Sequence, residues 1–205
     1  MCDLGPHAVP KSGNSRLPTD SRCSGKFVPL RLTVRGKAGT GKSALVKFIV
    51  RAVRRKYNAY DCIQVVAPTG SAANGVGGKT IHNRFGIPIH SKNLKISPDN
   101  LTKQLKKNSR LLVLILDERS MVSSSCFHTL HHYVSTTIFN GALQKHEWGA
   151  IPVLILVGDD GQLPPPIYPG IFSAFKNRKN NEIVHKGNVL YKNAASRVAT
   201  LDIIK

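Results

Sequence analysis

The chain has 205 residues, with 30 Lys and Arg against 11 Asp and Glu, and a formal net charge of +19. Hydrophobic residues make up 41% of it, enough for a packed core, so wholesale disorder is excluded. No apolar run approaches the roughly 18 residues of a membrane helix, which excludes an integral membrane protein. The surplus of positive charge favours a polyanionic partner, most often nucleic acid, although a merely basic protein has the same composition.

The N-terminal third of the chain predicts a leader followed by the first elements of a sheet. Residues 1–26 are rich in Ser, Gly and Pro and predict a disordered leader without a secretory signal. Alternating apolar residues predict a strand over 29–35, and helical spacing predicts a helix over 43–56. Cys62–Ala67 is a second short strand. The four cysteines are widely spaced and favour neither a zinc ribbon nor a disulfide scaffold, so a reduced intracellular compartment is expected.

Further strands and helices alternate along the rest of the chain. Ser97-Pro98-Asp99 predicts a helix start, and apolar residues follow one turn apart at Leu101 and Leu105. Leu111–Leu116 and Val153–Val157 are continuously apolar, as strands covered on both faces are. The amphipathic helix between them carries Phe127, Leu130, Val134 and Ile138. This alternation predicts an α/β fold with a mainly parallel sheet flanked by helices.

A phosphate-binding loop is the strongest single motif. Residues 36–43 fit G-x-x-x-x-G-K-[ST] between a predicted strand and a predicted helix, as the motif requires. The loop consists of Gly36, Lys37, Ala38, Gly39, Thr40, Gly41, Lys42 and Ser43. Its backbone N–H groups would surround an anion, Lys42 would reach the β- and γ-phosphates of ATP, and the Ser43 hydroxyl would ligate Mg²⁺.

Acidic residues follow two of the buried strands. Asp117 and Glu118 end the strand at 111–116, where Asp117 would hold Mg²⁺ and Glu118 would activate the attacking water. The strand at 153–157 leads into Gly-Asp-Asp-Gly-Gln-Leu-Pro-Pro-Pro at 158–166. There Asp159 or Asp160 would sense Mg²⁺ or its water, and Gln162 would hydrogen-bond the γ-phosphate. Four of only 11 acids therefore gather at strand ends, which is costly unless a cation lies among them.

A loop of small residues and hydroxyls follows the second predicted strand. It runs from Ala67 to Ala73 and continues at 77–82, and Lys79 is its only charged residue. Such a loop suits close approach to a sugar–phosphate backbone, although a tight surface loop explains it equally well.

Five segments together resemble the PIF family of DNA helicases (petite integration frequency type), which is related to the RecD helicases of superfamily one. The segments are Gly-Lys-Ala-Gly-Thr-Gly-Lys-Ser at 36–43, Ala-Pro-Thr-Gly-Ser-Ala-Ala at 67–73, Lys-Thr-Ile-His at 79–82 with Phe-Gly-Ile at 85–87, Leu-Asp-Glu-Arg-Ser-Met-Val at 116–122 and Gly-Asp-Asp-Gly-Gln-Leu-Pro-Pro at 158–165. They cover about residues 28–175 and imply a RecA-like P-loop NTPase domain.

The resemblance implies an ATP- and Mg²⁺-dependent 5′-to-3′ helicase that acts on single-stranded DNA. It further implies roles in DNA recombination, the repair of DNA damage and telomere maintenance, and such helicases also occur in Helitron-like transposons. A monomer in the nucleus is expected, with the mitochondrion as the alternative location.

The resemblance assigns roles to individual residues. Lys42 and Ser43 match the nucleotide lysine and the Mg²⁺ hydroxyl, Asp117 and Glu118 match the Mg²⁺ and water-activating acids, and Gln162 matches the γ-phosphate sensor. The DNA-contacting segments contain Pro68, Thr69, Gly70, Ser71, Thr80 and His82.

The chain departs from the family pattern in four ways. Arg119 stands where an apolar residue is usual, and Asp160 replaces a commonly apolar or aromatic residue. The adenine-reading glutamine upstream of the phosphate loop is missing, since the first glutamine is Gln64. Only 39 residues follow Pro166, too few for a second motor domain. The expected division is therefore a leader at 1–26, a first motor domain at 27–175 and a basic segment at 176–205, with ATP hydrolysis near background.

Two other functions remain open: another P-loop ATPase, such as a transposition or clamp-loading motor, and a non-enzymatic remnant that binds nucleic acid through charge alone.

The three histidines at 128, 131 and 132 share a helical face and predict an exposed polar surface rather than a zinc site. Trp148 is expected to pack in the protein rather than stack on a base. The basic segment Lys92–Arg110 either follows a phosphate backbone or is a solvated insertion.

Overall fold

A computed structural model describes residues 28–88, 94–138, 146–161, 165, 170 and 182–202 of the chain. The predicted leader at 1–26 and Gln162 lie outside these residues. The elements are β1 (Leu30–Gly36), α1 (Lys42–Tyr57), β2 (Ile63–Ala67), α2 (Gly70–Gly75), β3 (Lys79–Thr80), α3 (Ile81–Phe85), α4 (Pro98–Asn108), β4 (Val113–Leu116), η2 (Arg119–Met121), α5 (Ser124–Thr137), η4 (Glu147–Ala150), β5 (Val153–Gly158), α6 (Glu182–Ala194) and β6 (Arg197–Leu201).

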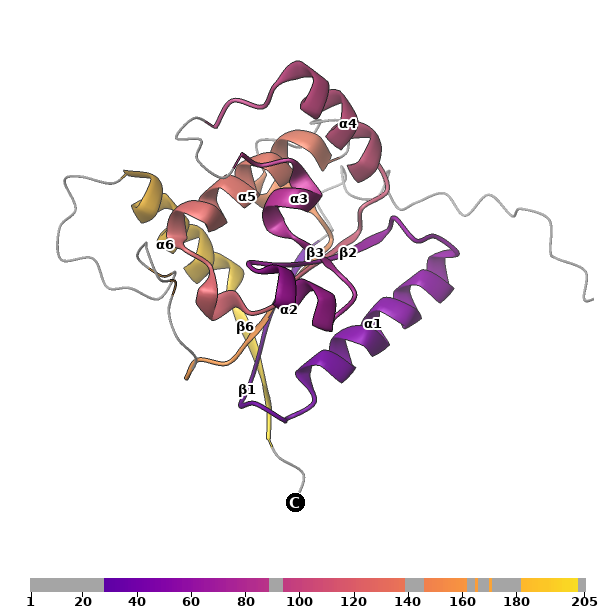
Figure 1. The fold of residues 1–205 in the computed structure, drawn as a ribbon, viewed down its shortest axis with the longest axis vertical. Coiled ribbons are helices and arrows are strands. Elements are labelled where there is room, and N and C mark those ends of the chain that lie inside the picture. Colours follow the sequence, from indigo (N-terminus) through magenta and orange to yellow (C-terminus); the bar gives the residue numbers. More distant parts are fainter. Residues whose placement is uncertain are drawn as a thin grey trace, which may run out of the picture.

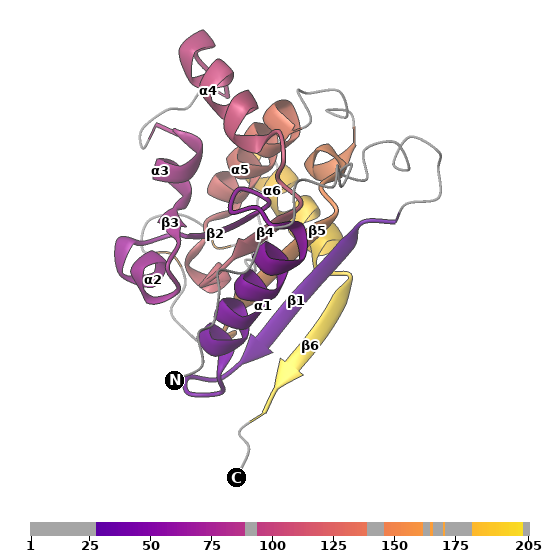
Figure 2. The same cartoon turned by 90° about the vertical axis from the view of Figure 1, so that its right-hand side faces the viewer.

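The strands form one six-stranded sheet in the order β3-β2-β4-β5-β1-β6, and every pair in it is parallel. Figures 1 and 2 show α1 on one side of the sheet and α5 and α6 on the other. The predicted α/β fold is therefore confirmed. Because all strands run the same way, the loops that follow β1, β4 and β5 leave the sheet at one common edge.

The continuously apolar strands are explained by two hydrophobic clusters, one on each face of the sheet. Alternate strand residues contribute to each cluster because side chains alternate across a strand. The cluster under α1 contains Ile63, Val65, Val113, Ile115, Ile155 and Val157. The cluster under α5 and α6 contains Val66, Leu114, Leu116, Leu154 and Leu156. No helix of the described residues is long and apolar enough to span a bilayer.

The strand β1 is polar on one face although it lies inside the sheet between β5 and β6. Arg31 is buried and donates to the carbonyl of Ile151 at 2.9 Å, and burial lowers the pKa of its guanidinium to about 10. Thr33 is fully buried, and Arg35 forms an ion pair with Asp160. Ile151 and Asp160, both from later in the chain, thus provide partners for the two arginines, and Arg35 stays substantially exposed.

Two packing expectations have different outcomes. Trp148 is fully buried, with its ring 5.1 Å from that of Phe127, so packing is confirmed and base stacking is excluded. The predicted exposed histidine face is wrong, because His128, His131 and His132 are all half-buried. The ring of His131 packs edge-on against Trp148, which covers part of it.

The sheet continues past residue 175. Helix α6 packs against α5, and β6 pairs with β1 from Leu32↔Arg197 to Gly36↔Leu201. The sequence pattern predicts neither element. The strand β6 lacks the apolar run that marks the central strands.

Candidate nucleotide-binding site

The phosphate loop connects β1 to α1 with a backbone that only glycine readily adopts. Gly39 and Gly41 have φ values of +80° and +85°, in the left-handed region. A side chain at Gly36 would collide with the hydroxyl of Thr40, which donates to the Lys37 carbonyl at 2.9 Å. The predicted glycine positions are thus required by the loop geometry.

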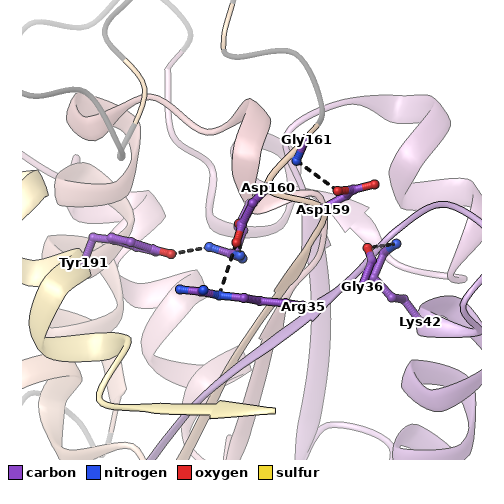
Figure 3. Close-up of polar contacts among 8 residues, drawn as sticks. Arg35, Gly36, Lys42, Asp159, Asp160, Gly161 and Tyr191 are labelled. Carbon is purple, nitrogen blue, oxygen red and sulfur yellow. Dashed lines mark hydrogen bonds and ion pairs between the residues drawn. The ribbon is translucent and has the colours of Figure 1, made fainter. Parts of the chain in front are cut away.

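The ammonium of Lys42 turns back toward the loop (Figure 3). It donates to the carbonyls of Gly36 at 2.7 Å and Lys37 at 2.8 Å. Lys42 begins α1, Ser43 follows it, and the first turn of the helix carries no acid. A helix N-terminus, backbone N–H groups and a lysine ammonium meet here, which is a combination that favours an anion such as phosphate.

The carboxylate of Asp117 lies at the same edge of the sheet, directly after β4. It is buried, and its Oδ1 accepts from the backbone N–H of Glu118 at 3.0 Å. Burial raises the pKa of this carboxyl, while the N–H of Glu118 and the charge of Lys42 act in the opposite direction. The structure therefore brings Asp117 within electrostatic reach of Lys42, as the sequence predicts.

Glu118 has a strained backbone. Its φ of 50° and ψ of 46° lie in the left-handed region, which disfavours a non-glycine residue by roughly 1–2 kcal/mol. The half-buried Glu118 precedes the single turn of η2. Strain of this kind clusters at functional sites, which supports the catalytic role expected for this residue.

The loop after β5 separates its two acids. Gly158 pairs with Arg35, so the loop leaves the sheet beside the phosphate loop. Asp159 accepts from the N–H of Gly161 at 2.9 Å and lies on the Lys42 side in Figure 3. Asp160 instead forms an ion pair with Arg35 at 3.2 Å. Of the two, Asp159 is therefore the candidate for a metal-bound water.

Asp160 also forms an ion pair with Arg119, so the two residues that differ in type from the family pattern are partners. Arg119 is fully buried, donates to the Tyr191 hydroxyl, and packs over Gly158, where a Cβ atom would meet its Cγ. This cluster joins the loop after β4, the loop after β5 and α6 (Figure 3). Comparison with the family pattern identifies both residues as unusual, but no local sequence pattern indicates that they contact each other.

The site offers suitable donors for Mg²⁺. Ser43 and Asp117 supply a hydroxyl and a carboxylate, both hard oxygen ligands, and Mg²⁺ is usually held by one or two carboxylates together with substrate phosphates. The burial that raises the pKa of Asp117 also means that a nearby cation would stabilise its charged form.

Two of the predicted DNA-contacting hydroxyls cap helices. Thr69 accepts from the N–H of Ala72 at 3.3 Å, and Thr80 accepts from the N–H of Asn83 at 3.2 Å. Both residues keep a hydroxyl hydrogen with which to donate to a phosphate. Pro68 and His82 are half-buried, whereas Gly70 and Ser71 are exposed at the start of α2. Burial lowers the pKa of His82, which favours the neutral form of its ring.

A parallel sheet with a phosphate loop after its first strand and acidic loops at the same edge defines a P-loop NTPase. The model of the PIF1-like helicase family matches residues 26–187. The chain therefore belongs to the PIF1-like helicase family.

Individual relatives agree with this assignment. The chain is 37% identical over 138 residues to the ATP-dependent DNA helicase PIF1 of Emericella nidulans, covering 63% of this chain and 17% of that one. The crystal structure of Pif1 helicase from Candida albicans superposes with a TM-score of 0.64 at 27% identity, over 86% of this chain and 37% of that one. The complex of Bacteroides Pif1 with ADP-AlF3 and ssDNA gives a TM-score of 0.54 at 26% identity, over 85% and 38%. The chain spans 14–18% of the length of three curated relatives.

Proposed function

We propose that this chain is the nucleotide-binding motor domain of an ATP-dependent 5′-to-3′ DNA helicase. The observation that carries the proposal is the convergence of the phosphate loop, Asp117 and the loop after β5 at one edge of a parallel sheet. Binding of nucleic acid through charge alone does not require a buried carboxylate close enough to Lys42 for the lysine charge to act on its pKa.

The residues divide the chemistry of ATP hydrolysis among them. The phosphate loop and Lys42 bind the β- and γ-phosphates. Ser43 and Asp117 would hold Mg²⁺, which when bound would withdraw charge from the γ-phosphate. Glu118 accepts a proton from the attacking water. The proposed contact of Gln162 with the γ-phosphate rests on the family resemblance alone, since this residue lies outside the described ones.

We assign single-stranded DNA to the loops around α2 and α3. The Bacteroides Pif1 structure that this fold resembles contains both ADP-AlF3 and ssDNA. The small exposed residues Gly70 and Ser71 leave space for a sugar–phosphate backbone, and Thr69 and Thr80 supply donors. Action as a monomer in nuclear DNA recombination, repair and telomere maintenance is proposed from the same resemblance.

The nucleotide site is tested by Lys42→Ala. This substitution removes the ammonium that faces the loop, so calorimetry should detect no Mg-ATP binding. The matched control is Lys47→Ala, an exposed lysine on α1, which should bind Mg-ATP as the wild type does. Equal ATP affinity in Lys42→Ala and the wild type would rule out this site, provided that circular dichroism shows both to be folded.

A further inference from the structure

A basic pocket lies on the β3 side of the sheet, outside the nucleotide site. It has a volume of about 560 Å³ and opens between β2, β3, α3 and α4. Five of its eight lining residues are Lys or Arg, and one is an acid. The lining consists of Asp61, Gln64, Lys79, Asn83, Arg84, Lys103, Lys106 and Lys107.

The guanidinium of Arg84 forms the buried wall of this pocket. Only 6% of the residue is exposed, yet its guanidinium donates to three neutral amides: Gln64 at 3.0 Å, Gln104 at 3.1 Å and Asn108 at 2.8 Å. Burial lowers the pKa of Arg84 to about 10, so the group still carries its charge at neutral pH. The amides orient the guanidinium without neutralising it.

The lysines of α4 add to this positive charge. Lys103 and Lys107 are four residues apart, so their ammonium groups share one helix face and repel each other. The one acid of the lining, Asp61, lies 3.9 Å from Arg110, which is itself a cation. An anion in the pocket would relieve the repulsion and partly replace the water that Arg84 has lost.

The pocket and the nucleotide site lie at different places on the sheet. Asp61 and Gln64 are at the start of β2, whereas the phosphate loop follows the end of β1, and the strands are parallel. In Figures 1 and 2, α4 is at the top and the loop between β1 and α1 at the bottom. The pocket is nevertheless adjacent in sequence to the proposed DNA-contacting residues. Its wall includes Arg84 of α3, and this helix begins directly after Thr80.

We infer that this pocket binds the phosphodiester backbone of a nucleic acid strand. Its cations are spread over β3, α3 and α4, which matches a run of phosphates better than one small anion. The inference rests on the proposed DNA-binding function, and it gives the basic segment at 92–110 a role along a phosphate backbone. The strand that lies on the α2 and α3 loops would continue over α4.

The test compares the salt dependence of DNA binding in three proteins: the wild type, Lys103→Gln with Lys107→Gln, and Lys47→Gln with Arg51→Gln. The last pair has the same spacing and charge change on the exposed surface of α1. The ligand is a fluorescent oligothymidylate, with inorganic pyrophosphate measured separately by thermal shift. Each lost phosphate contact lowers the slope of log K against log salt by about 0.7. The α4 variant should therefore lose about 1.4 in slope, and the control should lose little.

The outcomes separate this inference from the proposed function. An α4 variant with the same slope and affinity as the control, beside a wild type that binds DNA, overturns the pocket alone. A wild type that binds Mg-ATP but no oligothymidylate overturns both the pocket and the proposed DNA-binding function. Stabilisation by pyrophosphate that disappears in the α4 variant, with DNA binding unchanged, assigns the pocket to a small phosphate and overturns the nucleic acid occupant.

Discussion

At the scale of single residues, the ion pair between Arg119 and Asp160 accounts for the presence of both side chains. A buried arginine without a carboxylate partner would be costly, and the ion pair with Asp160 offsets part of that cost. Asp160 is half exposed, so the pair is partly screened, and the Tyr191 hydroxyl supplies a second partner for Arg119. The pair fixes the loop that carries Asp159 against the turn that follows Glu118.

This coupling predicts the result of a double-mutant cycle. Asp160→Asn removes the carboxylate charge and should lower the free energy of unfolding by about 1–3 kcal/mol, because Arg119 stays buried. In Arg119→Met, the same Asp160→Asn change should have a clearly smaller effect. Urea unfolding measures both, and Arg35→Gln serves as the control because Arg35 and Asp160 are both substantially exposed, which limits that pair to about 1 kcal/mol. Additive effects in the cycle would show that Arg119 and Asp160 are not coupled.

At the scale of elements, α5 contains a pH-sensitive contact. The His131 ring packs edge-on against Trp148 at 5.1 Å, and its Nε2 lies 3.4 Å from the Ser135 hydroxyl. Burial, followed by the charges of His128, His132 and Arg31, lowers the pKa of His131 to about 4. Between about pH 6.5 and pH 4 the unfolded chain therefore binds a proton that the folded chain does not.

Stability should consequently fall as the pH is lowered through this range. We expect His131 to account for about 1–3 kcal/mol of the loss, after allowance for its partial exposure. Both His131→Phe, which retains an aromatic ring beside Trp148, and His131→Gln should flatten the dependence. Trp148 is the single tryptophan, so its fluorescence follows unfolding at each pH. The same pH slope in wild type and both variants would contradict this assignment.

Local patterns predicted the elements with strong signals and missed those that depend on distant partners. Ser97 caps α4 and Pro98 opens it, as the sequence indicates. The buried residues of that helix, however, are Gln104 and Asn108 rather than leucines, because both meet Arg84 of α3. Short α2, α3 and β3 carry too few residues for any periodicity.

The nucleotide site was more predictable than its surroundings. The glycines and Lys42 of the phosphate loop, and the acids at the end of β4, follow from local rules about loops and strand ends. The basic pocket was not predictable in the same way, because its cations come from β3, α3 and α4, which meet only in the folded chain.

At the scale of the whole molecule, the proposed nucleotide site lies at one edge of a single sheet. Hydrolysis in related phosphoryl transfers is accelerated roughly 10³–10⁵-fold by an arginine that a second domain or protein contributes. The 205-residue chain alone should therefore bind Mg-ATP but release phosphate near the background rate, with little stimulation by single-stranded DNA.

A phosphate-release assay checks this expectation, with Glu118→Gln as the inactive control. Addition of a second motor domain from a Pif1 relative should restore DNA-stimulated turnover. Rapid turnover by the unassisted chain that disappears in Glu118→Gln would show that the single domain is sufficient.

The position of β1 in the sheet has a consequence for how the protein is made. The first strand has both its neighbours late in the chain, since Leu30 pairs with Val153 and Leu32 with Arg197. During synthesis at roughly 5–20 residues per second, β1 emerges from the ribosome well before either neighbour exists. The phosphate loop at the end of β1 cannot adopt its folded conformation until β5 and β6 have been synthesised. Nucleotide binding is therefore among the last properties that a newly made chain acquires, and premature release would yield a chain without it.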